Sequence, residues 1–393
     1  MTRKIKIKSF IVKIHLWLGL TSGLLVFFLG ITGCILAFQL EIENATQEYR
    51  FTQVREEPLL LPSVLKNIAD KEVPNKHAHS ISYEPGKSSQ VIYFSESPSY
   101  YYCVFLNPYT GEVLKTKNMD QDFFRIMVMG HYYLWLPPTI GQPILASATL
   151  IFVIMLITGL FLWWPKNKAA AANRFTIKWN ARWRRVNYDL HNVIGFYISW
   201  ITIFIALTGL IMGFIWFSKS IYWISSGGEE MKFYTESFSD TTNQVSSNST
   251  ILAMDQIWIN TKKANLDYKG SIEVHPPVDQ NSSIEIALNP LPGTYWKTDY
   301  LFYDQYTLKE IPVEHIYRKY EQASFADKIM RMNYDIHVGA IGGIVGKTIA
   351  FFASLFASSL PITGFLIWWG KRNKRKKEKR LDNCDTKKLE HFL

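Results

Sequence analysis

The chain alternates between long apolar stretches and polar segments. Four stretches of predominantly apolar residues lie at about 14–40, 142–164, 192–217 and 343–369. A helix needs roughly 20 such residues to cross a bilayer. The pattern therefore predicts four transmembrane helices, and it excludes a fully soluble protein.

Two long polar segments, 41–122 and 218–325, lie between the first and second spans and between the third and fourth. Each contains one stretch with helical periodicity, followed by short apolar–polar alternations that are typical of strands. The predicted helices lie near 59–69 and 251–263, and the predicted strands at 90–95, 101–106, 283–288 and 300–303. We therefore expect each segment to form a small α+β lobe.

The basic residues gather in three short pieces, 1–14, 165–190 and 370–393. Of the 393 residues, 48% are hydrophobic and 19% are charged, and the net charge is +10. The three pieces together carry 22 basic and five acidic residues, so the rest of the chain is net negative. Basic residues beside spans mark the cytoplasmic side. The distribution argues against nucleic-acid binding and predicts cytoplasmic termini, with both lobes on the outer side.

This topology divides the chain into eight parts. They are a basic segment with the first span (1–40), the first lobe (41–122), an interfacial segment with the second span (123–164), a basic cytoplasmic loop (165–190), the third span (191–217), the second lobe (218–325), an interfacial segment with the fourth span (326–369) and a basic cytoplasmic tail (370–393). The expected fold is an α-helical membrane bundle with two outer lobes.

The order span, lobe, span occurs twice, as an internal two-fold repeat. The first span of each copy has a histidine, a glycine four residues later and a Thr-Gly pair seventeen residues after the histidine: His15, Gly19 and Thr32-Gly33, then His191, Gly195 and Thr208-Gly209. Before the second span an arginine precedes a histidine by six residues, and the span ends in Thr-Gly-x-x-x-Trp-Trp. These residues are Arg125, His131 and Thr158–Trp164, then Arg331, His337 and Thr363–Trp369.

The four histidines at repeated positions are the main candidate functional residues. Ionisable side chains at a membrane are costly and usually functional. His15 and His191 each begin a span beside a basic cytoplasmic piece, whereas His131 and His337 each precede a span on the outer side. The repeat therefore predicts one histidine pair near each face of the membrane, with one member from each copy.

Two histidines without carboxylate or cysteine partners make a poor site for zinc or non-haem iron, which require three or four protein ligands. None of the three cysteines has a CxxC spacing. Haem supplies four equatorial nitrogens itself and needs only axial ligands. We therefore predict two b-type haems, one held by His15 and His191 and the other by His131 and His337.

Residues near the histidines suggest how haem would fit. Gly19 and Gly195 each share a helix face with the histidine four residues earlier, and such small residues would let a flat macrocycle lie against the helix. They would equally permit close helix packing. Arg125 and Arg331 are candidate partners for haem propionates on the outer side, and interfacial charge alone explains them equally well.

These motifs resemble those of the PepSY-associated transmembrane-helix proteins. The resemblance rests on His15–Gly19, on the two Thr-Gly-x-x-x-Trp-Trp ends and on residues 105–114, which look like the strand–turn–strand end of a PepSY-like lobe. It covers almost the whole chain and implies a bacterial inner-membrane protein tied to iron uptake, with two PepSY-like periplasmic lobes. Some members are ferric-siderophore reductases that carry haem, and the four histidines match their ligand positions. Residues 304–309 depart from the pattern because they lack the Pro and Gly.

Together these features predict an oxidoreductase that conducts electrons. A separate cytoplasmic or membrane donor would supply electrons through the two haems to a periplasmic ferric siderophore or other ferric chelate. The chain lacks the glycine-rich fingerprint of a nucleotide-binding domain, which is why the donor is expected to be a separate partner. The reaction requires no catalytic acid, base or nucleophile.

Two alternatives stay open. The protein could be a non-enzymatic PepSY membrane protein that binds or regulates a periplasmic partner or protease, but this leaves the repeated histidines unexplained. A permease would show polar residues or broken helices in mid-membrane, and the four spans show few.

Overall fold

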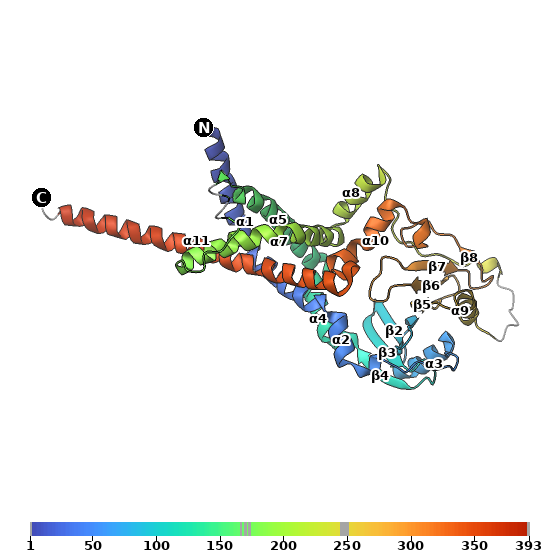
Figure 1. The fold of residues 1–393 in the computed structure, drawn as a ribbon. Helices are drawn as coiled ribbons and strands as arrows, with labels where there is room; N and C mark the ends of the chain where they lie inside the picture. Colours follow the sequence, from blue (N-terminus) through green and yellow to red (C-terminus); the bar gives the residue numbers. More distant parts are fainter. Residues whose placement is uncertain (1, 166, 169–170, 172–173, 244–250, 391–393) are drawn as a thin grey trace. The chain divides into compact units, whose positions relative to one another are not determined.

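The computed structural model describes residues 2–165, 167–168, 171, 174–243 and 251–390. The chain forms two compact units (Figure 1). The bundle unit comprises Met1–Ala37, Met129–Phe214 and His337–Leu393, and the sheet unit comprises Phe38–Val128 and Ile215–Ile336.

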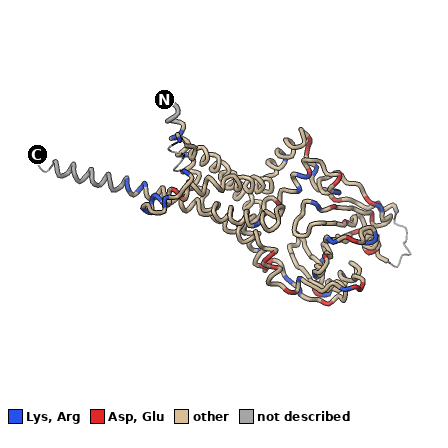
Figure 2. Tube along the Cα trace, in the orientation of Figure 1, with Lys and Arg blue, Asp and Glu red and all other residues tan. Residues whose placement is uncertain are grey.

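In the described part of the chain, four helices are long and apolar enough to cross a membrane. They are α1 (Thr2–Ala37), α5 (Pro138–Trp163), α7 (Trp183–Gly213) and α11 (Gly343–Glu390). The four predicted spans are confirmed, and the chain is a multi-pass membrane protein. Three of the helices continue into the basic segments, since Lys and Arg are good helix formers. Figure 2 shows the Lys and Arg residues of the bundle unit near the helix ends, away from the middle of the spans.

The four spans pack as a ring. α1 contacts α5 and α11, and α7 contacts the same two helices, so α1 and α7 lie at opposite corners. Small residues bring α1 and α11 close together. A Cβ added to Gly30 would lie 2.7 Å from Ser358 Cβ and 2.9 Å from the carbonyl oxygen of Ser354. Such close packing stabilises spans in lipid, where apolar burial gives little gain.

The two polar segments form one antiparallel sheet of eight strands in the order β4-β3-β2-β1-β5-β6-β7-β8. The strands are β1 (Ala78–Tyr83), β2 (Ser89–Glu96), β3 (Ser99–Leu106), β4 (Val113–Asn118), β5 (Ser271–His275), β6 (Ile284–Asn289), β7 (Asp299–Tyr303) and β8 (Glu310–Ile311). β1 pairs with β5, with Ile81 opposite Val274. The sequence pattern predicts two lobes. The structure joins them as two halves of one sheet.

Helices α3 (Pro62–Glu72) and α9 (Ala253–Ala264) pack on one face of this sheet, and the hydrophobic core of the sheet unit lies between these helices and the strands. Both lie close to their predicted positions. Pro62 occupies the first turn of α3, where its missing N–H has no helical partner to lose. The backbone N–H of Ser63 donates to Asp255 Oδ1 at 2.9 Å and links the two helices.

The turn between β3 and β4 and the turn between β7 and β8 share one geometry despite different sequences. Asn107 and Asp304 each accept, through Oδ1, hydrogen bonds from the backbone N–H groups two and three residues later. Four residues after each lies a positive φ, 75° at Gly111 and 58° at Leu308. A left-handed leucine costs about 1–2 kcal/mol, which the hydrogen bonds to Asp304 offset. The sequence departure at 304–309 therefore leaves this turn intact.

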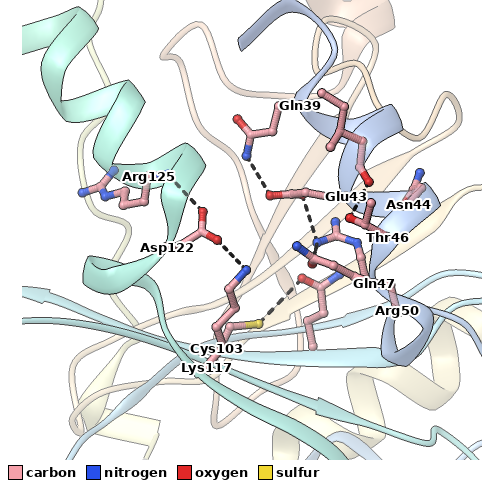
Figure 3. Close-up of polar contacts among 12 residues, drawn as sticks. Gln39, Glu43, Asn44, Thr46, Gln47, Arg50, Cys103, Lys117, Asp122 and Arg125 are labelled. Atoms are coloured by element: carbon pink, nitrogen blue, oxygen red, sulfur yellow. Dashed lines mark hydrogen bonds and ion pairs between the residues drawn. The ribbon is translucent and has the colours of Figure 1, made fainter. Parts of the chain in front are cut away.

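Four further helices, which the hydrophobic pattern did not distinguish from the spans and lobes, lie next to the spans in sequence. They are α2 (Gln39–Thr46), α4 (Phe123–Tyr133), α8 (Ile215–Ser226) and α10 (Phe325–His337), and 3₁₀ turns lie at Glu48–Arg50, Met119–Gln121, Thr241–Asn243, Tyr320–Gln322 and Ala340–Gly342. Asp122 caps α4 by accepting the N–H of Arg125, and it pairs with Lys117 at 2.6 Å (Figure 3). Glu43 of α2 pairs with Arg50 at 3.0 Å. The Asp122–Lys117 pair joins the start of α4 to β4, and the Glu43–Arg50 pair joins α2 to the 3₁₀ turn that follows it.

Candidate histidine site in the helical bundle

The four predicted histidines all lie in the bundle unit. His15 belongs to α1 and His191 to α7, while His131 lies in α4 and His337 is the last residue of α10. α4 precedes α5 in the chain and α10 precedes α11. Each predicted pair therefore comes from opposite corners of the ring of spans.

The structure brings His131 and His337 together. The centres of their imidazole rings are 6.2 Å apart, and the ring planes meet at 63°. A metal lies about 2 Å from a ligating histidine nitrogen and the ring centre about 1 Å beyond, so two axial imidazoles have centres about 6 Å apart. The observed spacing fits one metal ion between the two rings.

The second predicted pair, His15 and His191, comes from α1 and α7, which lie at opposite corners of the ring of spans. Among the described residues, no group of three or more His, Cys, Asp or Glu side chains could hold a metal ion by itself. A metal at either histidine pair would therefore need further ligands, and four equatorial porphyrin nitrogens meet that need. The donor set fits haem.

Each imidazole ring is held by the threonine of a Thr-Gly pair. The Nδ1 to Oγ1 distances are 2.9 Å for His15 and Thr158, 2.8 Å for His131 and Thr32, 2.9 Å for His191 and Thr363, and 3.0 Å for His337 and Thr208. Within the described residues, Nε2 of these histidines has no hydrogen bond. Nε2 is therefore the nitrogen available to a metal.

The glycine of each Thr-Gly pair leaves room for the same ring. The distance from an added Cβ to the ring carbon Cε1 would be 3.2 Å from Gly209 to His337, 3.2 Å from Gly364 to His191, 3.4 Å from Gly159 to His15 and 3.7 Å from Gly33 to His131. A methyl group at the two tightest positions would push the ring aside. Threonine and glycine thus form one seat for each histidine.

The structure places Gly19 and Gly195 against neighbouring spans. A Cβ added to Gly19 would lie 3.1 Å from Met155 Cε of α5, and one added to Gly195 would lie 3.7 Å from Leu360 Cδ2 of α11. These contacts correspond to the helix-packing interpretation of the small residues. A role beside haem stays a prediction for both glycines.

Arg125 and Arg331 lie in the sheet unit. Arg331 is buried, and its guanidinium donates to the backbone carbonyls of Arg318 and Thr298. The guanidinium carbon of Arg125 lies 5.2 Å from the centre of the Tyr101 ring. In both arginines Nε is buried without a hydrogen-bond partner in the described structure. Each keeps one donor, and binding of a haem propionate stays a prediction.

The threonines are site residues that were not predicted from the sequence. The sequence does contain a signal for them, because each of the four spans has one Thr-Gly pair and there are four repeated histidines. The missing information was which threonine meets which histidine, and this depends on helix packing.

A ring of four spans with two histidine pairs, together with an antiparallel sheet unit, defines a helical multi-pass membrane protein with an α+β portion. The chain belongs to the PepSY-associated TM region family, whose model matches residues 12–371. The resemblance noted in the sequence is thereby confirmed. No curated protein matches the chain.

Proposed function

We propose that this protein is a di-haem b electron-transfer protein of the inner membrane that reduces a periplasmic ferric chelate for iron acquisition. The observation that carries the proposal is the pairing of His131 and His337 with ring centres 6.2 Å apart. The Nδ1 atoms of all four repeated histidines are engaged by threonine, which leaves Nε2 for a metal. When bound, haem supplies one-electron redox chemistry at each pair.

The two histidine pairs would act at different depths. His15 and His191 would hold haem near the basic cytoplasmic end, and His131 and His337 near the outer end. The seventeen residues from His15 to Thr32, which seats His131, cover about 25 Å of helix. This distance is most of the roughly 30 Å of hydrocarbon in a bilayer. The ligands therefore mark a route across the membrane.

The substrate proposed for this route is a ferric siderophore or another ferric chelate with hard oxygen ligands. One electron from a separate cytoplasmic or membrane donor converts Fe(III) to Fe(II), and no bond of the chelator breaks. Oxygen chelators hold Fe(II) far less tightly, so the iron is released. The protein's own contribution is to bind, space and orient the redox centres, which requires no proton-transfer residue.

The first test is a visible spectrum of the detergent-purified protein, oxidised and dithionite-reduced, with haem quantified as the pyridine haemochrome. We expect a b-type reduced spectrum and about two haems per chain. His337→Ala should lose one haem and His191→Ala the other, while His77→Ala, at an exposed position in the sheet unit, should keep both. A colourless protein from haem-replete cells would contradict the proposal and favour a non-enzymatic, partner-binding role.

The second test addresses the reaction. The dithionite-reduced protein, freed of excess reductant, should be reoxidised by a ferric siderophore, and an Fe(II)-specific chromophore should report the released iron. The ferric siderophore should reoxidise the reduced His337→Ala variant much more slowly than the reduced wild type. A haem-loaded protein that no ferric chelate reoxidises would retain the electron-transfer assignment and overturn the substrate class.

A further inference from the structure

The threonine that seats each histidine has a defined hydrogen-bonding role. A hydroxyl group has one proton to donate. The Oγ1 of Thr32 lies 2.8 Å from the carbonyl oxygen of Phe28 in the preceding turn of its own helix. Thr158, Thr208 and Thr363 make the same type of bond to their own helices. Because the proton is used on the backbone, Oγ1 accepts a hydrogen bond from the histidine Nδ1–H.

At His337 a backbone carbonyl group gives independent evidence for the same protonation. Nδ1 of His337 also lies 3.0 Å from the carbonyl oxygen of Ile205. A carbonyl oxygen can only accept, so Nδ1 must carry the proton. The neutral histidine with its proton on Nδ1 has its lone pair on Nε2, the atom that a metal would bind.

We propose that Thr32, Thr158, Thr208 and Thr363 are positioning residues for haem ligands. Each accepts the Nδ1–H of one histidine, selects the Nε2 lone pair for the metal and fixes the direction of the ring. This inference rests on the proposed di-haem function. The seating contacts join spans within one half of the chain, whereas each haem would join the two halves.

The hydrogen bond also affects the midpoint potential of the haem iron that the histidine would bind. An imidazole whose Nδ1–H is hydrogen-bonded is a stronger electron donor, and a stronger donor favours Fe(III). Removing the acceptor should therefore shift the midpoint potential of that haem to a more positive value. Loss of such a partner typically weakens metal binding about 10–100-fold.

Thr32→Val tests this role, because valine keeps the shape of threonine and removes the hydroxyl next to His131. The expected result is at least about tenfold faster transfer of the outer haem to excess apomyoglobin, a positive shift of its midpoint potential and an altered electron paramagnetic resonance spectrum of the oxidised protein. Thr32→Ser keeps the hydroxyl and should restore all three properties.

Thr202→Val is the matched control. Thr202 is a buried threonine of α7 whose Oγ1 donates to the carbonyl oxygen of Ile198 at 2.8 Å, and among the described residues no histidine forms a hydrogen bond with it. The variant loses the same kind of backbone bond and should keep the wild-type potentials. If Thr202→Val shifted the midpoint potential as much as Thr32→Val does, general damage to the helix would explain both shifts. That result would overturn the positioning role.

The two proposals fail differently. A wild-type protein without haem would remove the proposed function and the positioning role together. A wild type with two haems and a Thr32→Val variant with unchanged potential, spectrum and haem transfer would overturn the positioning role alone. If Thr32→Val does not fold, Thr208→Val tests the same haem through its other ligand, His337.

Discussion

A single methyl group decides whether a histidine ring fits its seat. A Cβ at Gly209 would lie 3.2 Å from the ring of His337, whereas one at Gly33 would lie 3.7 Å from the ring of His131, an ordinary contact. Both histidines belong to the outer pair. We therefore predict that Gly209→Ala loses much more of the outer haem than Gly33→Ala does, as measured by pyridine haemochrome per chain. Equal loss in the two variants would contradict the packing argument.

The inner pair provides a second comparison for this prediction. The added Cβ would lie 3.2 Å from His191 at Gly364 and 3.4 Å from His15 at Gly159. Gly364→Ala should reduce the inner haem more than Gly159→Ala, with the outer haem retained in both variants. If the loss of haem does not increase as the added Cβ comes closer to the ring, the glycines serve helix packing and not the fit of the histidine rings.

Residue identity and spacing were sufficient to single out the four histidines as candidates, because repetition distinguishes them from the other five. They were insufficient to predict the seats. Thr32 shares a helix with His15, yet it contacts His131 from another helix. The ring nearest to a Cβ added at Gly33 is also that of His131. Side chains on one helix face can be read from periodicity, whereas contacts between spans depend on depth and rotation.

The carboxyl group of Glu285 in the sheet unit should give the protein a pH-dependent stability. Burial, together with the nearby Glu273, raises the pKa of Glu285 from 4.5 to about 7, and a hydrogen bond from Tyr234 opposes this shift. Between these values the unfolded chain has released the proton and the folded chain still holds it. The free energy of unfolding must therefore fall as pH rises from about 4.5 to 7.

Glu285→Gln removes this titration. We predict that the melting temperature of the variant relative to the wild type increases between pH 5 and pH 7 and changes little from pH 7.5 to 8.5, as measured by scanning fluorimetry in detergent. Subtracting the wild-type curve cancels the other titrating groups. A difference that is flat from pH 5 to 7 would show that Glu285 ionises normally.

At the scale of elements, apolar periodicity was most informative where one face of an element is buried. The four spans, α3, α9 and strands β2, β3, β6 and β7 were all predicted. β1 was not predicted because its fully buried residue Ser80 interrupts the apolar alternation. β4 escaped because it is an edge strand with Lys115 and Lys117, as is common for edges. The pairing of β1 with β5 left no local signal at all.

The crossing of α1 and α11 depends on Gly30. A Cβ there would overlap Ser358 Cβ at 2.7 Å and the Ser354 carbonyl oxygen at 2.9 Å, and a backbone atom cannot rotate away. Gly30→Ala should therefore force the helices apart and destabilise the bundle by about 1–3 kcal/mol. Gly342→Ala is the control, because its added Cβ would meet nothing within 4 Å. The measurement is the melting temperature in detergent, and equal values for the two variants would refute the close crossing.

At the scale of the whole molecule, different contacts serve different parts of the repeat. Histidine–threonine bonds join helices within each half of the chain. The packing of α1 on α11 and of α5 on α7 joins the two halves in the bundle unit, and the pairing of β1 with β5 joins them in the sheet unit. Each half alone would have seated histidines but only one member of each pair. The proposed haem sites therefore require both halves.

The route proposed across the membrane requires a defined orientation. The basic loop 165–190 and the basic tail predict a cytoplasmic end of the bundle, next to His15 and His191. Single cysteines test this in a Cys384→Ser background, because Cys34 and Cys103 are buried. An impermeant maleimide should label Thr110→Cys and Asp267→Cys, at exposed positions of the sheet unit, in cells with an intact cytoplasmic membrane. Asn180→Cys should be labelled only after permeabilisation.

The same experiment decides the direction of electron flow. If Asn180→Cys reacts in intact cells and the two sheet-unit cysteines do not, the orientation is inverted. His131 and His337 would then face the cytoplasm and could not deliver electrons to a ferric chelate outside. If only one of the two sheet-unit cysteines reacts, the halves of the sheet would lie on different sides, which the pairing of Ile81 with Val274 forbids. Labelling of both sheet-unit cysteines in intact cells, without labelling of Asn180→Cys, is the one pattern that satisfies the sheet, the basic segments and the proposed reaction together.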